Sequence, residues 1–481
     1  MTPLRLLKMG IILMVRSYQW INFHRLLTSK VLQCSERIKM NYSVKKIGQI
    51  LNATTQIDSK IVTGVSFDSR KVKSGDLFVA LVAENDGHDY VQQALTKGAT
   101  AVLVDDRHQI DSKIPAIIVS DTLLALQQLG EYRRHQINPK VVAITGSNGK
   151  TTTKDMASAI MGSQYKTFKT PENFNNEIGV PLTLLTMPDD TEVLVVELGM
   201  DRPGQLTTLS ELVSPDIAII TMIGEAHIEF FKTRENIAKA KLEITKGLKS
   251  QGTLLVPYDE PLLTNAQVKQ NVQTFGQDIK DINSSSSKTI FTYQNTRFAI
   301  PLLGRYNIMN ALAAISAGIL LHIELKNAAE ALQHFDLTKN RTEQLTTSHG
   351  VNLISDVYNS NPTAVAAVLA TLKIIPATHK YVVLGDMLEL GEQAASLHAC
   401  LAETVINANV DGVYLVGPLM NKYLYPILQR RFDSAHLHQY ETDQLAELIK
   451  DLQTLGENGD VILLKASHGI HLENVVNALV K

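Results

Sequence analysis

The spacing of apolar and polar residues changes several times along the chain. Residues 41–51, NYSVKKIGQIL, repeat apolar positions at helical spacing and predict an amphipathic helix. Strand-like and helix-like stretches then alternate as far as the polar segment HQINPK, residues 135–140, which we expect to be a linker. This first part of the chain therefore predicts a small α/β module.

The middle of the chain carries continuous apolar runs, such as KVVAIT, EVLVVELGM and DIAIITMIG. Runs of this kind are typical of parallel strands that are covered on both faces. KTIFTYQNTRFAIP predicts a hairpin with its turn at Gln294 and Asn295, and NIMNALAAISAGILLHI predicts a long helix. A parallel-sheet domain is the expected result.

Strands and helices alternate again in the last third, where NLISDVY, KYVVLGDM, DGVYLVGP and DVILLKAS read as strands. Parallel sheets bind ligands at the carboxyl ends of their strands. That rule directs attention to Asp356, Asp386 and residues 465–468. We predict a second βαβ sheet here.

The predicted fold is α/β with three domains, which suits a length of 481 residues. We expect a small N-terminal domain at 40–137, a central P-loop parallel-sheet domain at 138–335 and a Rossmann-like C-terminal domain at 336–481. Residues 1–39 are interpreted as a leader outside the folded unit, and Met40 as the start of the folded unit.

Charge and cysteine content narrow the class of protein. A net charge of −2 gives no general attraction to nucleic acid. Two cysteines form no disulfide framework, which suits a reducing cytoplasm. The leader is basic, and its apolar run at 9–15 is far shorter than the roughly 20 residues that span a bilayer. A basic amphipathic membrane anchor is the alternative for this segment.

The segment TGSNGKTTTK, residues 145–154, lies between a predicted strand and a predicted helix, as a phosphate-binding loop does. Gly146 and Gly149 let backbone N–H groups point inward, and the helix N-terminus adds positive potential. Lys150 can reach the β- and γ-phosphates, and Thr151 can bind Mg²⁺. The strict motif would need glycine where this chain has Ile144, so a plain turn with an exposed lysine is the alternative.

Three further residues are candidate metal ligands. Glu197 ends a buried strand, where a carboxylate is costly unless it binds something. His227 follows the next strand, and Lys241 lies on a predicted helix. Taken singly, each has a structural alternative: a paired or capping carboxylate, a structural histidine and a solvated lysine.

Together, six segments occur in an order that resembles the Mur ligases of peptidoglycan synthesis. They are TGSNGKTTTK, NFNNEIGVPLTLL, VVELGM, EAHIEFF with AKAKLEI, YNIMNALAA and DVYNSNP. SFDSRKVKSGDLFVAL and DGHDYV resemble the first domain of this family. NFNNEIG and DVYNSNP resemble the member that adds a dipeptide rather than the member that adds the third residue.

The resemblance implies an ADP-forming, ATP-dependent ligase that joins D-Ala-D-Ala to UDP-N-acetylmuramoyl-tripeptide through an acyl phosphate. It implies two Mg²⁺ ions and a carbamylated Lys241, because CO₂ would turn a cationic amine into an anionic oxygen ligand. It also implies a cytoplasmic enzyme that acts as a monomer, without nucleic acid and without stable membrane insertion.

The resemblance also assigns roles to individual residues. The catalytic residues are Lys150, His227 and Lys241, and the metal ligands are Thr151, Glu197, His227 and Lys241. The ATP-binding residues are Gly146, Ser147, Asn148, Gly149, Lys150, Thr151, Thr152, Asn310, Arg341 and Asp356. The substrate-binding residues are Ser69, Arg70, Asn173, Asn175, Asn176 and Tyr358.

Two other functions compete with this interpretation. One is another ligase of the same superfamily, of the muramoyl-dipeptide or folylpolyglutamate type. The other is a nucleotide-dependent switch without ligation, which would not need the SFDSR and NFNNEIG segments. One departure affects substrate contacts: Ala466 and His468 in KASHGIHLE stand where the family has a lysine–glycine–serine–arginine segment.

Overall fold

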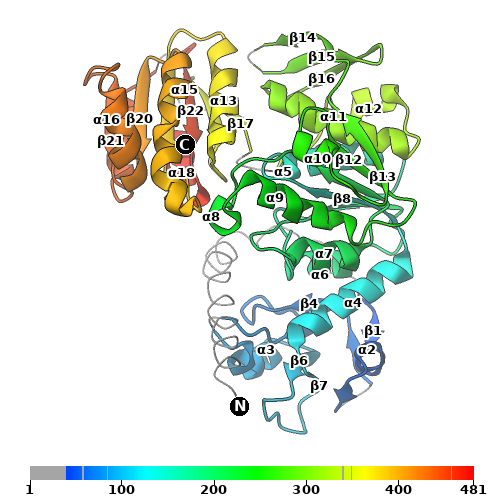
Figure 1. Cartoon of the computed structure of the whole chain (residues 1–481). Coiled ribbons are helices and arrows are strands. Elements are labelled where there is room, and N and C mark those ends of the chain that lie inside the picture. The colour runs from blue at the N-terminus through cyan, green and yellow to red at the C-terminus, as the bar shows by residue number, and fades with distance from the viewer. Residues whose placement is uncertain are drawn as a thin grey trace, which may run out of the picture. The chain divides into compact units, whose positions relative to one another are not determined.

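The computed structural model describes residues 40–56, 59–83, 85–285, 287–338, 341–347, 349–456 and 458–480 (Figure 1). The leader at 1–39 lies outside the described residues. Contacts within the chain define two compact units. The first contains the described residues up to Pro139 together with Asn173–Glu192, and the second contains Lys140–Glu172 and the residues from Val193 onward.

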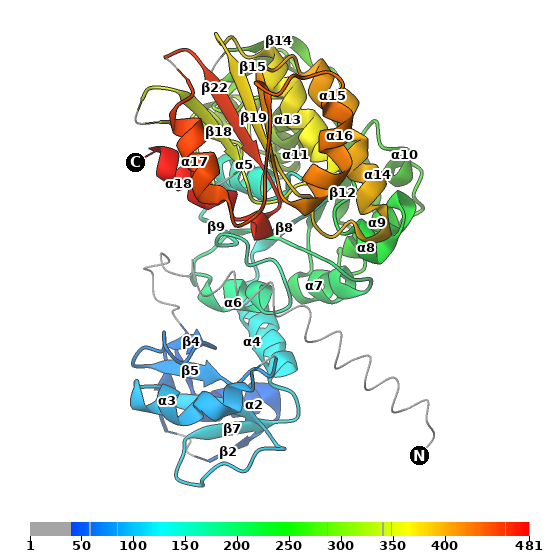
Figure 2. The same cartoon turned by 90° about the vertical axis from the view of Figure 1, so that its left-hand side faces the viewer.

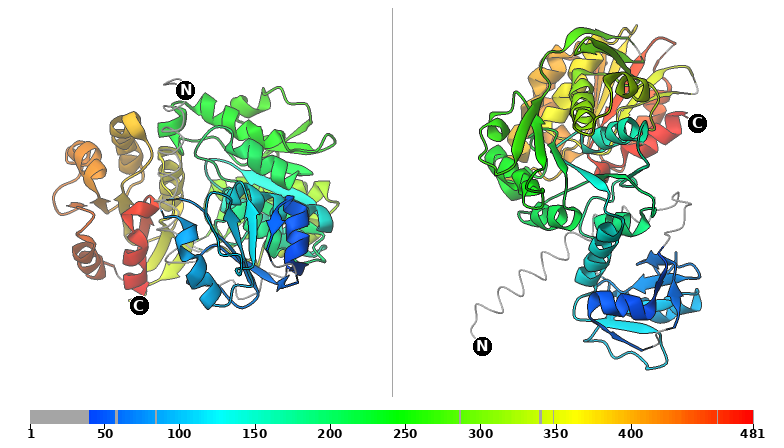
Figure 3. Two further views of the ribbon diagram at one scale, coloured as in Figure 1. Left: turned by 90° about the horizontal axis from the view of Figure 1, so that it is seen from below. Right: turned by 90° about the vertical axis from the view of Figure 1, so that its right-hand side faces the viewer.

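A five-stranded sheet forms the centre of the first unit (Figure 3). Four of its strands are parallel, and β2 pairs antiparallel at one edge. The predicted amphipathic helix is present as α2 (Val44–Leu51), with Ser43 as its N-cap. In spatial order the strands are β2 (Thr54–Thr55), β7 (Ala116–Val119), β6 (Ala101–Asp105), β5 (Asp76–Val79) and β4 (Gly64–Ser66).

Two helices far apart in sequence pack together in the first unit. Gly130 on α4 (Thr122–Ile137) lies so close to Pro181 on α6 (Gly179–Thr186) that an added Cβ would approach its main chain to 3.0 Å. Helix α4 continues to Ile137, so the predicted linker at 135–140 is wrong for its first three residues. The last turn of the helix satisfies their hydrogen bonds, and Asn138 ends it in the left-handed conformation.

The second unit contains the predicted parallel sheet of the middle region. All its pairings are parallel, and its β8 carries the candidate phosphate loop. Helices α5 (Lys150–Gly162) and α11 (Arg305–Leu320) pack together in the core of this region. In spatial order the strands are β13 (Asn271–Phe275), β12 (Thr253–Pro257), β11 (Ile217–Ile220), β8 (Lys140–Thr145), β10 (Val193–Glu197) and β9 (Thr167–Lys169).

The predicted hairpin is confirmed as β15 (Thr289–Tyr293) and β16 (Thr296–Ile300), which pair antiparallel, with β14 (Lys280–Ser284) beside them. Gln294 and Asn295 both have positive φ, as a two-residue hairpin turn requires.

The last region of the second unit has its own six-stranded sheet, in which only β17 runs antiparallel. Figure 2 shows α17 (Leu445–Gln453) and α18 (Leu472–Val480) on one side of it, and α13 (Pro362–Ile374) with α15 (Leu401–Asn407) on the other. The strands, in spatial order, are β17 (Glu343–Thr346), β18 (Asn352–Asp356), β22 (Val461–Lys465), β19 (Lys380–Gly385), β20 (Gly412–Val416) and β21 (Leu437–Tyr440).

These three sheet regions confirm the predicted α/β fold. The domain boundaries stay predictions, because the compact units divide the chain differently. Among the described residues, no helix is both long enough and apolar enough to cross a membrane.

Candidate active site

The loop after β8 is curled by two glycines and fixed by the neighbouring strand. Gly146 and Gly149 have φ of 152° and 82°. An added Cβ would lie 1.8 Å from Thr221 Oγ1 at the first and 2.3 Å from Asn310 Oδ1 at the second. The N–H of Ser147 donates to Met222 O at 3.0 Å. The two positions therefore admit only glycine, and the loop has the form that a phosphate site needs.

Lys150 begins α5, directly after this loop. Its Nζ donates to Gly146 O at 2.8 Å, so the side chain turns back over the loop. Burial lowers the pKa of Lys150; the charge of Glu197 opposes this shift, and the charge of Arg341 adds to it. The lysine is therefore close to both groups and is a natural partner for an anion.

Glu197 and Thr151 provide oxygen atoms beside the same loop. Glu197 ends β10, is fully buried, and is in register with Ile144 of β8. Its own N–H donates to Thr170 Oγ1 at 3.0 Å. Thr151 Oγ1 is buried and has no hydrogen-bond partner among the described residues. An unpaired buried hydroxyl is costly, so this oxygen fits a divalent cation that prefers oxygen ligands.

Lys241 ends α9 (Arg234–Lys241) and is 2% exposed. In the part of the chain that the structure describes, its side chain has no hydrogen bond or ion pair. Burial, and next the charge of Lys150, hold the pKa of Lys241 well below its usual value. A lowered pKa favours the neutral amine, which is the form that adds to CO₂, so this residue fits the carbamate that the resemblance implies.

His227 lies just before the short helix α8 (Ile228–Phe231), in the left-handed conformation with φ of 62°. Its Nδ1 is 2.5 Å from Oε2 of Glu389, which follows β19. Burial would raise the pKa of Glu389, but the charge and contact of His227 and the charge of Arg202 outweigh it and lower the pKa. No sequence pattern indicated this contact, because the two residues are far apart in the chain.

The residues assigned to the C-terminal part of the ATP site form two contacts with other side chains. Asp356 is paired with Lys465, whose Nζ lies 2.6 Å from Asp356 Oδ2, and the two residues are in register on β18 and β22. The guanidinium of Arg341 lies 3.8 Å from the ring centre of Tyr358, and His468 stacks on that ring at 5.7 Å. Asp356 is therefore paired with a buried lysine, and the roles of these residues toward ATP stay predictions.

Two expected ATP contacts have other partners in the structure. Asn310 is buried against Gly149, and its Nδ2 donates to Asn307 Oδ1 at 3.1 Å. Asn148 and Asn361 exchange two amide hydrogen bonds of 3.2 and 2.9 Å. Asn310 therefore shapes the loop, and the Asn148 side chain joins it to the start of α13. Ser147 Oγ donates to Gly224 O at 3.2 Å, and Thr152 is buried on α5.

The substrate residues predicted in the first unit have local partners. Ser69 Oγ donates to Gln93 Oε1 at 2.5 Å, and Arg70 makes two 2.9 Å bonds to Asp68 while staying exposed. Asn176 Oδ1 accepts from the N–H groups of Ile178 and Gly179 at the start of α6. The segment of Asn173, Asn175 and Asn176 therefore belongs to the first unit.

Asp86, His88 and His108 in the first unit have the spacing of metal ligands. The N–H of Asp105 donates to His88 Nε2 at 3.0 Å, so the proton of His88 is on Nδ1, which donates to Asp86. A metal ion bound at Nδ1 of His88 would require the proton to be on Nε2. There it would face the N–H of Asp105, which is also a donor. His108 instead bridges Asp105 and Asp86 at 2.7 and 3.0 Å. The hydrogen bonds and ion pairs of the three side chains therefore form a charge network with Asp105.

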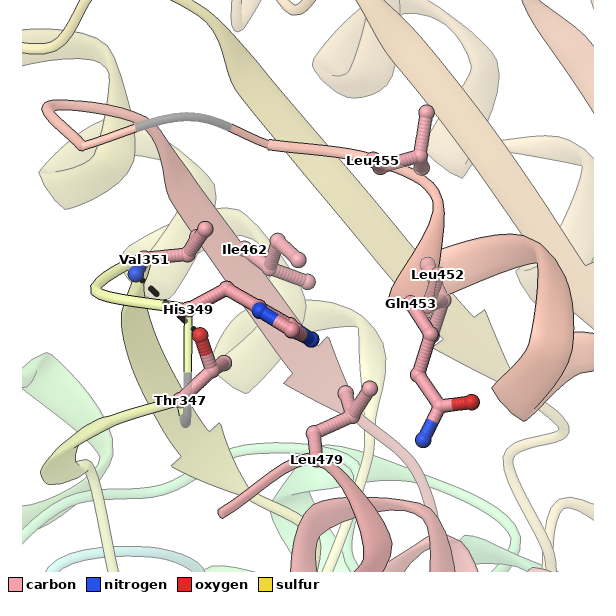
Figure 4. Close-up of a pocket in the computed structure, with 8 residues that line it drawn as sticks. All are labelled: Thr347, His349, Val351, Leu452, Gln453, Leu455, Ile462 and Leu479. Carbon is pink, nitrogen blue, oxygen red and sulfur yellow. Dashed lines mark hydrogen bonds between the residues drawn. The ribbon is translucent and has the colours of Figure 1, made fainter. Parts of the chain in front are cut away.

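A small hollow in the last region lies away from all these residues. Figure 4 shows Val351, just before β18, and Ile462 on β22, with Leu452 and Leu479 facing them from α17 and α18. The Val351 N–H donates to Thr347 Oγ1 at its rim. Thr347, His349, Gln453 and Leu455 complete the lining of this hollow.

A parallel sheet with a phosphate-type loop on β8, flanked by a carboxylate, a hydroxyl and a buried lysine, is typical of enzymes that transfer phosphoryl groups from nucleotides. Three family models match the chain: the Mur ligase family catalytic domain at 61–140, the Mur ligase middle domain at 144–318 and the Mur ligase glutamate ligase domain at 340–468. The chain belongs to the Mur ligase family and is an ATP-dependent ligase.

Individual relatives agree with this assignment. The UDP-N-acetylmuramoyl-tripeptide–D-alanyl-D-alanine ligase of Bacillus subtilis (strain 168) is 39% identical over 91% of this chain and 98% of its own. The crystal structure of MurF from Acinetobacter baumannii has a TM-score of 0.82 at 29% identity, covering 92% of this chain and 99% of that chain. MurF from Thermotoga maritima in complex with ADP has a TM-score of 0.76 at 29% identity, covering 86% and 96%.

The charge network predicts a pH dependence of stability. The hydrogen bond from His108 to Asp105 and the charges of Asp105 and Asp86 raise the pKa of His108. A raised folded-state pKa stabilises the protein fully below the unfolded pKa, and the effect is lost as pH rises through the folded pKa. We expect His108→Gln to lower the free energy of unfolding more near about pH 6 than near about pH 9. His334→Gln, at an exposed histidine, is the control. An equal loss of unfolding free energy at both pH values in His108→Gln would contradict this prediction.

Proposed function

We propose that this chain adds D-Ala-D-Ala to UDP-N-acetylmuramoyl-tripeptide with hydrolysis of ATP to ADP and phosphate. The observation that carries the proposal is the combination of the loop at Gly146–Gly149 with Lys241, which is buried and has a lowered pKa. Near-full-length similarity to relatives named for this reaction supports the substrate assignment. The cytoplasmic location and the monomeric state stay predictions.

The reaction is proposed to run in two steps. The carboxylate of the tripeptide attacks the γ-phosphorus of ATP, which gives an acyl phosphate and ADP. The dipeptide amine then attacks the acyl carbon, loses a proton, and displaces inorganic phosphate from the tetrahedral intermediate. A free carboxylate is a poor electrophile, so phosphorylation supplies the leaving group that amide formation needs.

The chain's own residues would align these groups and balance their charge. Backbone N–H groups of the loop and Lys150 would hold the phosphates, in the manner of other phosphate loops. Thr151 and Glu197 would hold one Mg²⁺, and His227 with carbamylated Lys241 would hold a second. Bound Mg²⁺ neutralises the charge that develops on the transferred phosphoryl group. Arg341, Asp356 and Tyr358 lie beside a strand end where the nucleotide and dipeptide would meet.

The substrates themselves test this proposal. Phosphate release is expected only when ATP, the UDP-linked tripeptide and D-Ala-D-Ala are all present. Equal release without the dipeptide would favour the nucleotide-dependent switch. Release that follows glutamate in place of the dipeptide would favour another ligase of the superfamily.

Lys150→Ala is expected to lower kcat/KM by at least about 100-fold, because the variant lacks the cation that holds the transferred phosphate. The rate of ADP formation measures the effect, and a thermal unfolding curve shows whether the variant is folded. Normal turnover in a folded Lys150→Ala protein would rule out this role.

Lys241→Ala is expected to be inactive and to recover part of its activity in acetate or formate, which replace the missing carbamate oxygen. Lys239→Ala on the same helix is the matched control, since Lys239 is exposed and should be dispensable. A folded Lys241→Ala enzyme with full activity, or one that small carboxylates never restore, would contradict the carbamate.

A further inference from the structure

Two strained residues meet where the central region of the second unit contacts its C-terminal region. His227 and Glu389 both adopt the left-handed conformation, with φ of 62° and 61°. Neither is glycine, so each conformation persists only because its surroundings enforce it. Strain of this kind is common at functional sites, and it directs attention to what the two residues do together.

Main-chain contacts fix the distance between them. The N–H of Glu229 donates to the carbonyl of Glu389 at 3.1 Å. A Cβ added to Gly391 would lie 2.8 Å from Cγ of Glu229, so the turn after β19 fits closely against the start of α8. The carboxylate of Glu389 then reaches Nδ1 of His227 at 2.5 Å. This carboxylate is the group that faces Nδ1 in the described part of the chain.

We propose that Glu389 is a positioning residue for His227. Its carboxylate accepts the proton of Nδ1 and thereby leaves the lone pair of Nε2 available for a metal ion. A histidine ligand commonly donates its other ring N–H to a carboxylate, which fixes both the tautomer and the ring orientation. The proposal rests on the proposed function only in taking His227 as a metal ligand.

The position of Glu389 gives this contact a wider consequence. The carboxylate comes from the C-terminal sheet, whereas the histidine follows β11 of the central sheet. Further hydrogen bonds join the same two regions, among them Asn148 to Asn361, Thr363 Oγ1 to Glu225 Oε1 at 2.9 Å, and Gln393 Nε2 to Lys232 O at 2.9 Å. The metal site is therefore complete only when the C-terminal region is docked.

These contacts supply a matched control. Gln393 lies four residues after Glu389 and joins the same regions, but it bonds a main-chain carbonyl and not His227. Gln393→Ala therefore removes a docking bond and leaves the imidazole untouched. Glu389→Ala removes the acceptor, and Glu389→Gln keeps the size and one acceptor oxygen.

The direct readout is the tautomer of His227 in the full-length protein labelled with ¹⁵N-histidine. The His227 signals are assigned by their loss in His227→Asn. Wild type, Gln393→Ala and Glu389→Gln should carry the proton on Nδ1, and Glu389→Ala should lose this preference. The same tautomer in Glu389→Ala as in wild type would overturn the proposal, even if the variant were less stable.

The dependence on Mg²⁺ is the second readout. Loss of a carboxylate that orients a ligand typically weakens metal affinity about 10- to 100-fold. We expect the Mg²⁺ concentration for half-maximal activity to rise by about that factor in Glu389→Ala and to stay within about twofold in Gln393→Ala. Equal rises in both variants would mean that Glu389 acts only through docking. A third outcome would reject His227 as a metal ligand: the tautomer changes in Glu389→Ala, but His227→Asn responds to Mg²⁺ as wild type does. Glu389 would then still position the His227 ring.

Discussion

Positive charge gathered in poorly hydrated surroundings is the constraint on which the active region depends. Lys150 lies on the loop after β8, close enough to Lys241 to lower the pKa of that buried amine, and Arg341 adds to the effect on Lys150. Glu197 is the carboxylate whose charge opposes it. Cations in such a place are costly without anions. A triphosphate would supply that charge, and a carbamate on Lys241 would replace a buried amine with an anion.

The sheets bring these groups together from distant parts of the sequence. Glu197 and the loop after β8 meet because β8 and β10 are parallel neighbours in register. Asp356 and Lys465 meet for the same reason on β18 and β22. Parallel strands end at one edge, so polar residues placed just after them collect there. The fold thus brings Asp356 and Lys465, which are more than 100 residues apart in the sequence, into an ion pair.

Much of this arrangement could be predicted because its determinants are local. The hairpin turn at Gln294–Asn295 and the glycine-rich loop at 146–149 each depend on a few neighbouring residues. The extent of α4 was misjudged, because His135 and Gln136 look like linker residues but complete the last helical turn. Local signals describe turns well and helix ends poorly.

Contacts that depend on tertiary packing gave no signal in the sequence. The amide of Asn148 is bonded to Asn361, 213 positions away, whereas its role toward ATP stays a prediction. No role was predicted for Glu389, because its partner, His227, follows a strand of another sheet. The order of the motifs indicated the family, whereas the pairing of individual side chains required the structure.

The most direct measurement follows oxygen from the tripeptide carboxylate to phosphate. The UDP-linked tripeptide, with ¹⁸O at both oxygens of its terminal carboxylate, is incubated with the enzyme, ATP and D-Ala-D-Ala. The masses of the products are measured by mass spectrometry. The account predicts a pentapeptide that has lost one label and inorganic phosphate that has gained it. A pentapeptide that keeps both labels, or phosphate formed without any pentapeptide, would contradict it.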